Sequence, residues 1–160
     1  MDNQYVYRVT ASSTSVRSGI VTAEEIAPSI GFSAPPEFDG QAATWTPEHF
    51  LVTAVAACFV STFSGMADLS KLDFLLLEVA TEGVLERDES GWRFTRINLR
   101  PRLNIAQEKD REKAARLLEK AHKNCLILRS LACPSVLEPE IAVQEEFVER
   151  RRNGEPVAIG

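Results

Sequence analysis

The sequence predicts one globular domain that contains both strands and helices, and three observations lead to that prediction. The chain has 160 residues, 44% hydrophobic and 26% charged, which is enough apolar material for a single core. Its first third is rich in β-forming residues arranged in short runs. Two later segments, 46–69 and 108–124, have the composition and spacing of helices. We expect one domain over residues 1–148 and a loosely held tail over residues 149–160.

The overall charge, the N-terminal residues and the length of the apolar runs argue against several functional classes. A formal net charge of -5 argues against nucleic-acid binding, because such domains usually present a basic face to the phosphate backbone. The N-terminal residues lack a charged region followed by an apolar one, and no apolar run is expected to reach the roughly 20 residues that cross a bilayer. We therefore predict a soluble, cytoplasmic protein with no nucleic-acid and no membrane partner.

The N-terminal third is expected to form a hairpin followed by a loop. Strands are predicted at 5–13 and 18–26, separated by a polar turn that contains Arg17. The next segment, 28–45, holds three of the eight prolines and two glycines, which interrupt regular structure. It is expected to be a loop that includes at most one short strand, at 29–33.

The segment that follows has the signals of a helix start. Thr46 is a suitable N-cap, Pro47 occupies the first helical position without losing a hydrogen bond, and Glu48 places negative charge where the helix dipole favours it. We predict that the helix continues to about Leu69. Residues 50–63 are apolar on nearly every face, so we expect this helix to be buried all round, at the centre of the fold or at a subunit interface.

The C-terminal half is expected to contain a second hairpin, two helices and a last strand. Residues 74–105 give two long strands around a polar turn that contains a glycine. Residues 108–124 form an amphipathic pattern, and a short helix is predicted at 125–132. A final strand is predicted at 135–147. The apolar stripe of the amphipathic helix consists of Ala114, Leu117, Leu118, Ala121 and then Cys125.

Three motifs in this order resemble a known family. They are the Thr-Pro-Glu helix start with Cys58 ten residues beyond Glu48, the preceding loop GFSAPPEFDG, and a second cysteine in AHKNCLILRSL, which is Cys125. Together they resemble, over essentially the whole chain, the OsmC/Ohr family of osmotically induced and organic hydroperoxide resistance proteins. The resemblance implies an α+β fold with antiparallel sheets packed around a central buried helix. It also implies an intertwined homodimer and a pair of thiols that reduce hydroperoxides.

The resemblance assigns roles to four residues. A thiol peroxidase needs one thiolate to attack the O–O bond and a second thiol to convert the sulfenic acid into a disulfide, and Cys58 and Cys125 would be that pair. Burial raises the pKa of a thiol unless a positive group stabilises the thiolate. In the family this group is an arginine held by the glutamate at the helix start. Glu48 is therefore the expected holder, and Arg17 the candidate arginine, with Arg129 as an alternative.

The chain departs from the family pattern at two places. Many relatives carry the arginine in the loop just before the helix start, where residues 40–45 contain no basic residue and Thr44 stands at about that position. Other relatives carry it in the N-terminal region, which Arg17 would match. The second cysteine of relatives is commonly followed by proline, whereas Leu126 follows Cys125 here.

Helix geometry bears on how Glu48 and Cys58 can cooperate. Ten residues at about 1.5 Å each separate them by roughly 15 Å along the axis and by about 80° around it. Either a long arginine bridges this gap, or Glu48 comes from an antiparallel helix of a partner chain. The apolar character of the helix favours the second arrangement, and we predict a composite site at a homodimer interface.

Simpler interpretations exist for each of these residues. A free cysteine often behaves as a small buried hydrophobic residue, Glu48 as a first-turn acid and Arg17 as a solvated turn residue. Cys133 has no family counterpart and is expected to be structural. Three cysteines are an odd number and do not form the even framework of a disulfide-built secreted domain.

Several cofactor and catalytic signatures are missing from the sequence. His49 and His122 have no second ligand at metal spacing, so no zinc site is expected. The sequence has neither a glycine-rich phosphate loop nor a GxSxG motif, and flavin, haem and nicotinamide are not implied.

We therefore predict a cofactor-free peroxidase that reduces organic or inorganic hydroperoxides and is reset by a dithiol reductant. The alternative, from another class, is a non-catalytic module on the same scaffold that binds a small ligand or lipid, or that senses redox state.

Overall fold

The computed structural model describes residues 4–144 and divides into two compact units, which meet between Leu51 and Val52. Each unit is described by itself. The predicted tail at 149–160 lies outside the described residues, and the single domain expected over 1–148 stays a prediction.

The first unit contains a three-stranded antiparallel sheet in the order β1-β2-β3, with β1 at Thr10–Ser15, β2 at Ser18–Ala23 and β3 at Ile26–Ser33. The predicted hairpin is confirmed. The predicted loop is wrong at its start, because β3 is a full strand that runs through Pro28. A proline is tolerated here because β3 is an edge strand and its register against β2 shifts between Val21 and Ala23.

The loop after β3 leads into helix α1, Pro47–Leu69, through a short 3-10 turn, η1, at Pro36–Phe38. The backbone N–H of His49 donates to Thr46 Oγ1 over 3.3 Å, and that of Phe50 donates to the Thr46 carbonyl over 3.0 Å. The first bond satisfies a helix-start amide that would otherwise have no partner, and the second is the first backbone hydrogen bond of the helix itself. They confirm Thr46 as the N-cap, and both bounds of α1 agree with the sequence prediction.

The second unit is built on a four-stranded sheet. The strands β4, Phe74–Asp88, and β5, Gly91–Ile105, form the predicted long hairpin. Two short strands, β6 at Ser135–Leu137 and β7 at Glu140–Val143, both pair parallel to β5. One strand was predicted over 135–147, and the structure instead has two, separated by Glu138 and Pro139. A proline at this break removes a donor from the ladder.

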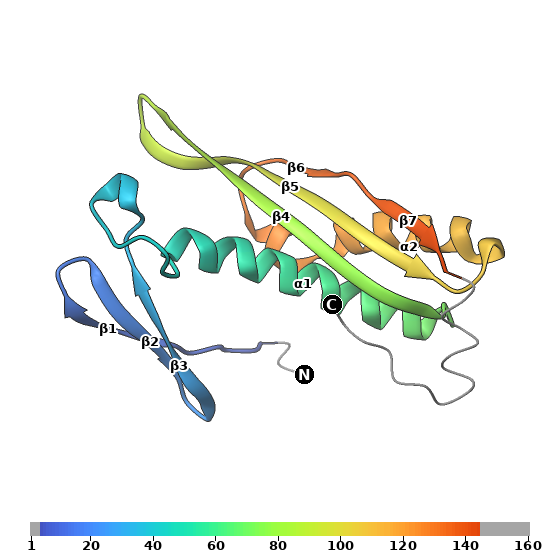
Figure 1. The fold of residues 1–160 in the computed structure, drawn as a ribbon, viewed down its shortest axis with the longest axis horizontal. Helices are drawn as coiled ribbons and strands as arrows, with labels where there is room; N and C mark the ends of the chain where they lie inside the picture. The colour runs from blue at the N-terminus through green and yellow to red at the C-terminus, as the bar shows by residue number, and fades with distance from the viewer. Residues whose placement is uncertain (1–3, 145–160) are drawn as a thin grey trace. The chain divides into compact units, whose positions relative to one another are not determined.

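Helices cover one face of this sheet. Figure 1 shows α1 running alongside the β4–β5 hairpin. A 3-10 turn, η2, at Glu108–Asp110 precedes α2, Arg111–Asn124, and then the five-residue helix α3, Leu126–Ser130. These confirm the two helices predicted in this region. The predicted stripe is also confirmed, because Ala114, Leu117, Leu118, Ala121 and Cys125 are all buried in one cluster with Ile97, Leu99, Leu103 and Ile105 of β5.

The burial of α1 differs from the prediction. Within the described chain it buries one stripe against the sheet, formed by Val55, Phe59, Phe63 and Ala67. These residues recur every fourth position, so they lie on one side of the helix. Other positions between them, including Ala57 and Ser61, are exposed. The helix is therefore packed on the sheet along one side and is not buried all round by its own chain.

The length of α1 also corrects an expectation. By length and composition alone its 23 residues could cross a membrane, although no apolar run was expected to be long enough. One such helix is weak evidence for a membrane span, because core helices of soluble proteins pass the same test, and α1 buries one stripe of residues in the core cluster.

Candidate active site

Cys58 lies on α1 immediately before Phe59 of the buried stripe, and it is partly buried. Its thiol is free, as are those of the other two cysteines. Thr62 stands one helical turn further on, and its hydroxyl oxygen is 3.9 Å from Cys58 Sγ. Residues four apart share a face of a helix, so this contact follows from the sequence spacing.

Cys125 lies at the junction between α2 and α3 and is fully buried. Its backbone is extended, with φ -63° and ψ 114°, so the chain turns there and starts a new helix at Leu126. This turn brings the Cys125 thiol close enough to Cys58 to act on its pKa. The structure therefore brings together the two cysteines that the sequence predicted as a pair.

Hydrogen bonds from uncharged groups act on the pKa of Cys58. Burial by itself raises that pKa, but the backbone N–H of Ile127, the Cys125 thiol, the Thr62 hydroxyl and the backbone N–H of Leu126 all oppose it. Together they hold the pKa of Cys58 below its ordinary value of 9.0. From the sequence we expected a cation to lower the pKa of Cys58, whereas these four donors carry no charge.

The pKa of Cys125 moves in the opposite direction, to about 11. Burial is the largest cause, and the neighbouring Cys58 raises it further through its hydrogen bond and charge, against the backbone N–H groups of Leu128 and Ile127. Cys58 therefore ionises first, and Cys125 keeps its proton to donate to the Cys58 sulfur. This asymmetry is what an attacking thiolate and a resolving thiol require.

The structure does not pair Arg17 with Glu48. Arg17 has a left-handed backbone, φ 62°, in the β1–β2 turn, and its guanidinium donates to the carbonyl oxygen of Phe38. The same guanidinium forms an ion pair with Asp39, Nη2 to Oδ2, over 3.3 Å. Glu48 Oε2 is buried and has no hydrogen-bond partner among the described residues. The catalytic roles expected for these two residues stay predictions.

The remaining candidates have ordinary structural contacts. Cys133 is partly buried against the core cluster. His122 Nε2 lies 2.8 Å from Ser135 Oγ and so connects α2 to β6. Within residues 4–144, no group of three His, Cys, Asp or Glu side chains is arranged to hold a metal ion.

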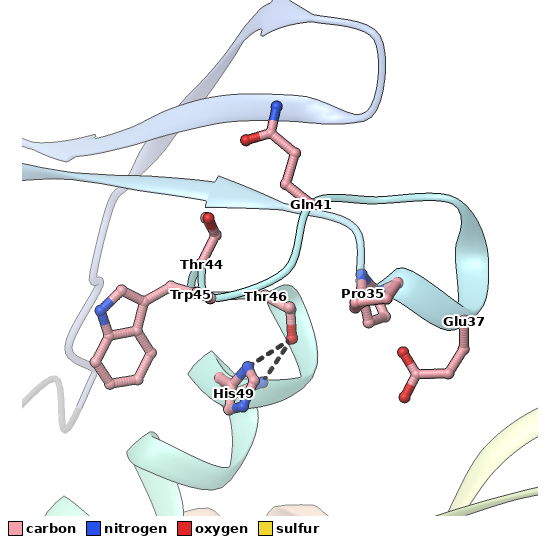
Figure 2. Close-up of a pocket in the computed structure, with 9 residues that line it drawn as sticks. Pro35, Glu37, Gln41, Thr44, Trp45, Thr46 and His49 are labelled. Carbon is pink, nitrogen blue, oxygen red and sulfur yellow. Dashed lines mark hydrogen bonds between the residues drawn. The ribbon is translucent and has the colours of Figure 1, made fainter.

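A hollow of about 430 Å³ lies in the first unit, and the sequence did not predict it. Figure 2 shows Thr46 at the start of α1 with its hydroxyl facing the imidazole of His49, and Nδ1 is 2.9 Å from that hydroxyl. The Trp45 ring packs edge-on to the same imidazole, with ring centres 6.0 Å apart. The lining residues are Pro35, Pro36, Glu37, Gln41, Ala43, Thr44, Trp45, Thr46 and His49.

Sequence reasoning missed three of the groups around Cys58. The i, i+4 spacing of Cys58 and Thr62 could have identified the hydroxyl. The backbone N–H groups of Leu126 and Ile127 could have been suspected from a helix start directly after Cys125, because the first amides of a helix have no partner within it. What no local pattern could supply was that α3 packs its start against α1.

The described geometry can be compared with known proteins. A family model described as "OsmC-like protein" matches residues 39–140, which include Glu48, Cys58 and Cys125. The chain is 28% identical over 115 residues to the protein YmaD of Bacillus subtilis, whose name calls it uncharacterized, and the match covers 70% of this chain and 77% of that protein.

Solved structures share the fold. The OsmC-like protein VCA0330 of Vibrio cholerae has a TM-score of 0.75 at 18% identity, covering 85% of this chain and 99% of that one. An organic hydroperoxide resistance protein of Elizabethkingia anophelis has a TM-score of 0.71 at 20% identity, covering 90% and 100%. OhrB of Bacillus subtilis, also named an organic hydroperoxide resistance protein, has a TM-score of 0.63 at 22% identity, covering 86% and 98%. The α+β fold and the matched motifs agree, and the chain belongs to the OsmC-like protein family.

Proposed function

We propose that the protein is a thiol-dependent peroxidase that reduces hydroperoxides through Cys58 and Cys125. The observation that carries this proposal is the proximity of the two thiols, which act on each other's pKa values and shift in opposite directions. A cysteine that only packs in the core would have no hydrogen-bond donors around it, and burial would then keep its pKa raised.

The reaction has three steps. The Cys58 thiolate attacks one oxygen of the hydroperoxide, the O–O bond breaks, and Cys58 becomes a sulfenic acid while the other oxygen leaves as an alkoxide that takes up a proton. The Cys125 sulfur, after losing its proton, then attacks the Cys58 sulfur and releases water as the disulfide forms. An external dithiol reduces this disulfide and is itself oxidised, which returns both thiols.

Arg17 and Glu48 are proposed to act on the leaving oxygen. A guanidinium stays protonated at any physiological pH, so it can stabilise the developing alkoxide. Glu48 supports this idea because its buried Oε2 has no hydrogen-bond partner among the described residues, as expected of a carboxylate whose partner comes from elsewhere. We propose a homodimer in which a second chain completes this part of the site.

The substrate class is proposed from chemistry and from relatives. Two of the solved structures with this fold are named organic hydroperoxide resistance proteins. OsmC-like proteins are soluble, and the free thiols of this chain fit the reducing environment of the cytoplasm, where we propose that it acts as an antioxidant in the stress response. No cofactor takes part in the proposed steps.

A second candidate function is ligand binding without turnover. The hollow of about 430 Å³ favours it, because this volume falls within the range of small-molecule pockets and the rings of Trp45 and His49 line it. In this alternative the cysteines serve only as packing residues or as a redox sensor.

Peroxide consumption separates the two functions. We expect the wild type to consume cumene hydroperoxide in the presence of a dithiol, and Cys58→Ser to lose on the order of a thousandfold or more of that rate. Cys133→Ser is the matched control, because it removes a thiol that has no part in the proposed steps. Equal rates for the wild type and Cys58→Ser would reject the peroxidase and favour the binding module.

A further inference from the structure

We propose that the hollow at the start of α1 is a binding site for a small organic amine that carries an apolar, ring-sized body. The hollow has a volume of about 430 Å³, which is within the range of small-molecule sites. All of its lining residues belong to the first unit. The proposal gives a ligand class to the binding module named above as the second candidate function, and it holds whether or not Cys58 reduces peroxides.

A carboxylate without a partner lies on one side of the hollow. Of the described lining residues, Glu37 is the one with a fixed charge. It belongs to η1, is exposed, and makes no hydrogen bond or ion pair within residues 4–144. The guanidinium of Arg17 bonds to the two residues that follow, because it donates to the Phe38 carbonyl and pairs with Asp39 over 3.3 Å. The Glu37 carboxylate is therefore available to a ligand.

The charge around the hollow is negative. Residues 34–51 contain Glu37, Asp39 and Glu48 but no lysine or arginine, and Arg17 offsets only one of these three acids. The start of α1 adds a partial positive charge of about half a unit, which Glu48 in its first turn outweighs. We therefore expect the hollow to attract a cation and to repel a carboxylate.

Trp45 supplies an apolar wall. Figure 2 shows its indole and the Glu37 carboxylate on opposite sides of Thr46 and His49. Trp45 is 51% exposed, yet its ring is held in place. It stacks on Phe50 with ring centres 6.2 Å apart and planes 18° apart, and it meets the His49 ring edge-on. An aromatic surface that is exposed but already fixed can pack against a ligand ring at little cost in side-chain entropy.

The polar groups between these two sides are bonded to each other. Thr46 Oγ1 accepts from the backbone N–H of His49 and lies 2.9 Å from His49 Nδ1. The rings of Pro35 and Pro36 add further apolar lining. The separation of charge and apolar surface defines the ligand. Its ammonium group would donate charge-assisted hydrogen bonds to Glu37, and its body would pack on the indole and proline rings.

Hydrogen bonds of the loop before α1 keep the walls of the hollow in place. The backbone N–H of Gly40 donates to the Pro35 carbonyl over 3.0 Å. That of Gln41 donates to Ser33 Oγ over 2.9 Å, and that of Ser33 donates to the Trp45 carbonyl over 2.9 Å. These bonds do not depend on a ligand. The site is therefore preformed, and binding has little chain to order.

The test titrates the whole chain, labelled for nuclear magnetic resonance, with three ligands of similar shape. At neutral pH phenethylamine is a cation, phenethyl alcohol is neutral and phenylpropionate is an anion. The chain has two tryptophans, so a spectrum of Trp92→Phe assigns the indole N–H signal of Trp45. We expect phenethylamine to shift this signal until it saturates, and to bind about threefold to tenfold more tightly than the alcohol. Phenylpropionate should bind most weakly.

Variants of Glu37 test the carboxylate directly. Glu37→Gln keeps the size of an exposed side chain and removes its charge, so the affinity for phenethylamine should fall to about that for the alcohol. Glu24→Gln is the matched control, because it removes the same charge at another exposed position of the first unit. Glu37→Lys should reverse the preference, so that phenylpropionate binds more tightly than the amine.

Equal affinities of the wild type for the amine and the alcohol would overturn the proposal. Equal losses in Glu37→Gln and Glu24→Gln, or a Trp45 signal that the amine does not move, would overturn it as well. None of these measurements uses a peroxide. A wild type that does not consume peroxide would therefore reject the proposed peroxidase and leave the amine site intact, and the reverse also holds.

Discussion

Two sulfurs with different pKa values define the site at the level of single residues. Motif resemblance selected Cys58 and Cys125, and the structure brings these two thiols near each other, while their role as a redox pair stays a proposal. The reason why Cys58 ionises first could not be read from the sequence. It depends on groups of residues more than sixty positions away, and no local pattern shows that the start of α3 comes close to Cys58 of α1.

The first residue-level prediction concerns the order in which the thiols react. The pKa of Cys58 lies below 9.0 and that of Cys125 is about 11, so Cys58 is the first of the two to become a thiolate as the pH rises. We expect alkylation of Cys58 to rise with a midpoint below pH 9, and that of Cys125 to lag by two units or more. Site-resolved labelling from pH 6 to 11 checks this. Faster labelling of Cys125 at pH 7 would contradict it.

A second prediction concerns Arg17 and Glu48. If Glu48 positions the guanidinium, removing either residue removes the same effect, so the losses in peroxide reaction rate should not add. We expect Arg17→Ala, Glu48→Ala and the double variant each to slow the oxidation of Cys58 by a similar factor, on the order of tenfold to a hundredfold. Stopped-flow oxidation in a single turnover measures these rates. Independent losses that multiply in the double variant would show that the two residues act separately.

At the level of secondary structure, local signals located most elements, and long-range pairing decided the rest. Capping and periodicity gave both bounds of α1 and the stripe of α2, since these depend on neighbours in the sequence. The strand β3 was underestimated because Pro28 and Gly31 within it are residues typical of loops, and pairing with β2 overrode that signal. The division into β6 and β7 follows from their pairing with β5.

The turn before α1 gives a prediction about stability. A Cβ on Gly40 would stand 1.5 Å from the carbonyl oxygen of Ala34, so the backbone would have to move. We expect Gly40→Ala to lower the free energy of unfolding by about 1–3 kcal/mol. Gly31→Ala is the control in the same unit, because nothing lies within 4 Å of its added Cβ. Urea unfolding of both variants checks this, and equal midpoints would contradict it.

The contact between α2 and β6 gives a prediction about pH. Burial lowers the pKa of His122 from 6.5, and Lys123 lowers it further against Glu119, so folding favours the neutral imidazole. As the pH falls through 6.5 the unfolded chain takes up a proton before the folded one, and the free energy of unfolding therefore decreases. We expect this acid-side loss to be smaller in His122→Gln. Urea midpoints at pH 7.5 and 5 measure it, and identical pH dependence in both proteins would count against it.

At the level of the whole molecule, α1 connects the fold to the proposed dimer. The side of α1 that its own chain leaves exposed carries small residues, namely Thr53, Ala54, Ala57, Ser61 and Gly65. Small side chains allow another backbone to approach closely, which fits the partner helix that the apolar character of α1 favoured over a bridging arginine.

We expect the wild type to have about twice the 17.7 kDa mass of one chain in light scattering. Ala57→Arg should shift it to the mass of a monomer, because a long charged side chain would block the approach of a second helix. Gln107→Arg, which makes the same charge change at another exposed position, should leave the mass unchanged. A monomeric wild type would contradict the proposed dimer.

In the proposed reaction a peroxide oxidises Cys58, and Cys125 then forms a disulfide with it. The most direct test treats the reduced protein with one equivalent of cumene hydroperoxide and maps its disulfides by mass spectrometry without reduction. We expect each chain to lose two thiols and to contain one Cys58–Cys125 disulfide, with Cys133 still free. If Cys58 and Cys125 both remain thiols while the peroxide persists, the proposed peroxidase reaction is contradicted.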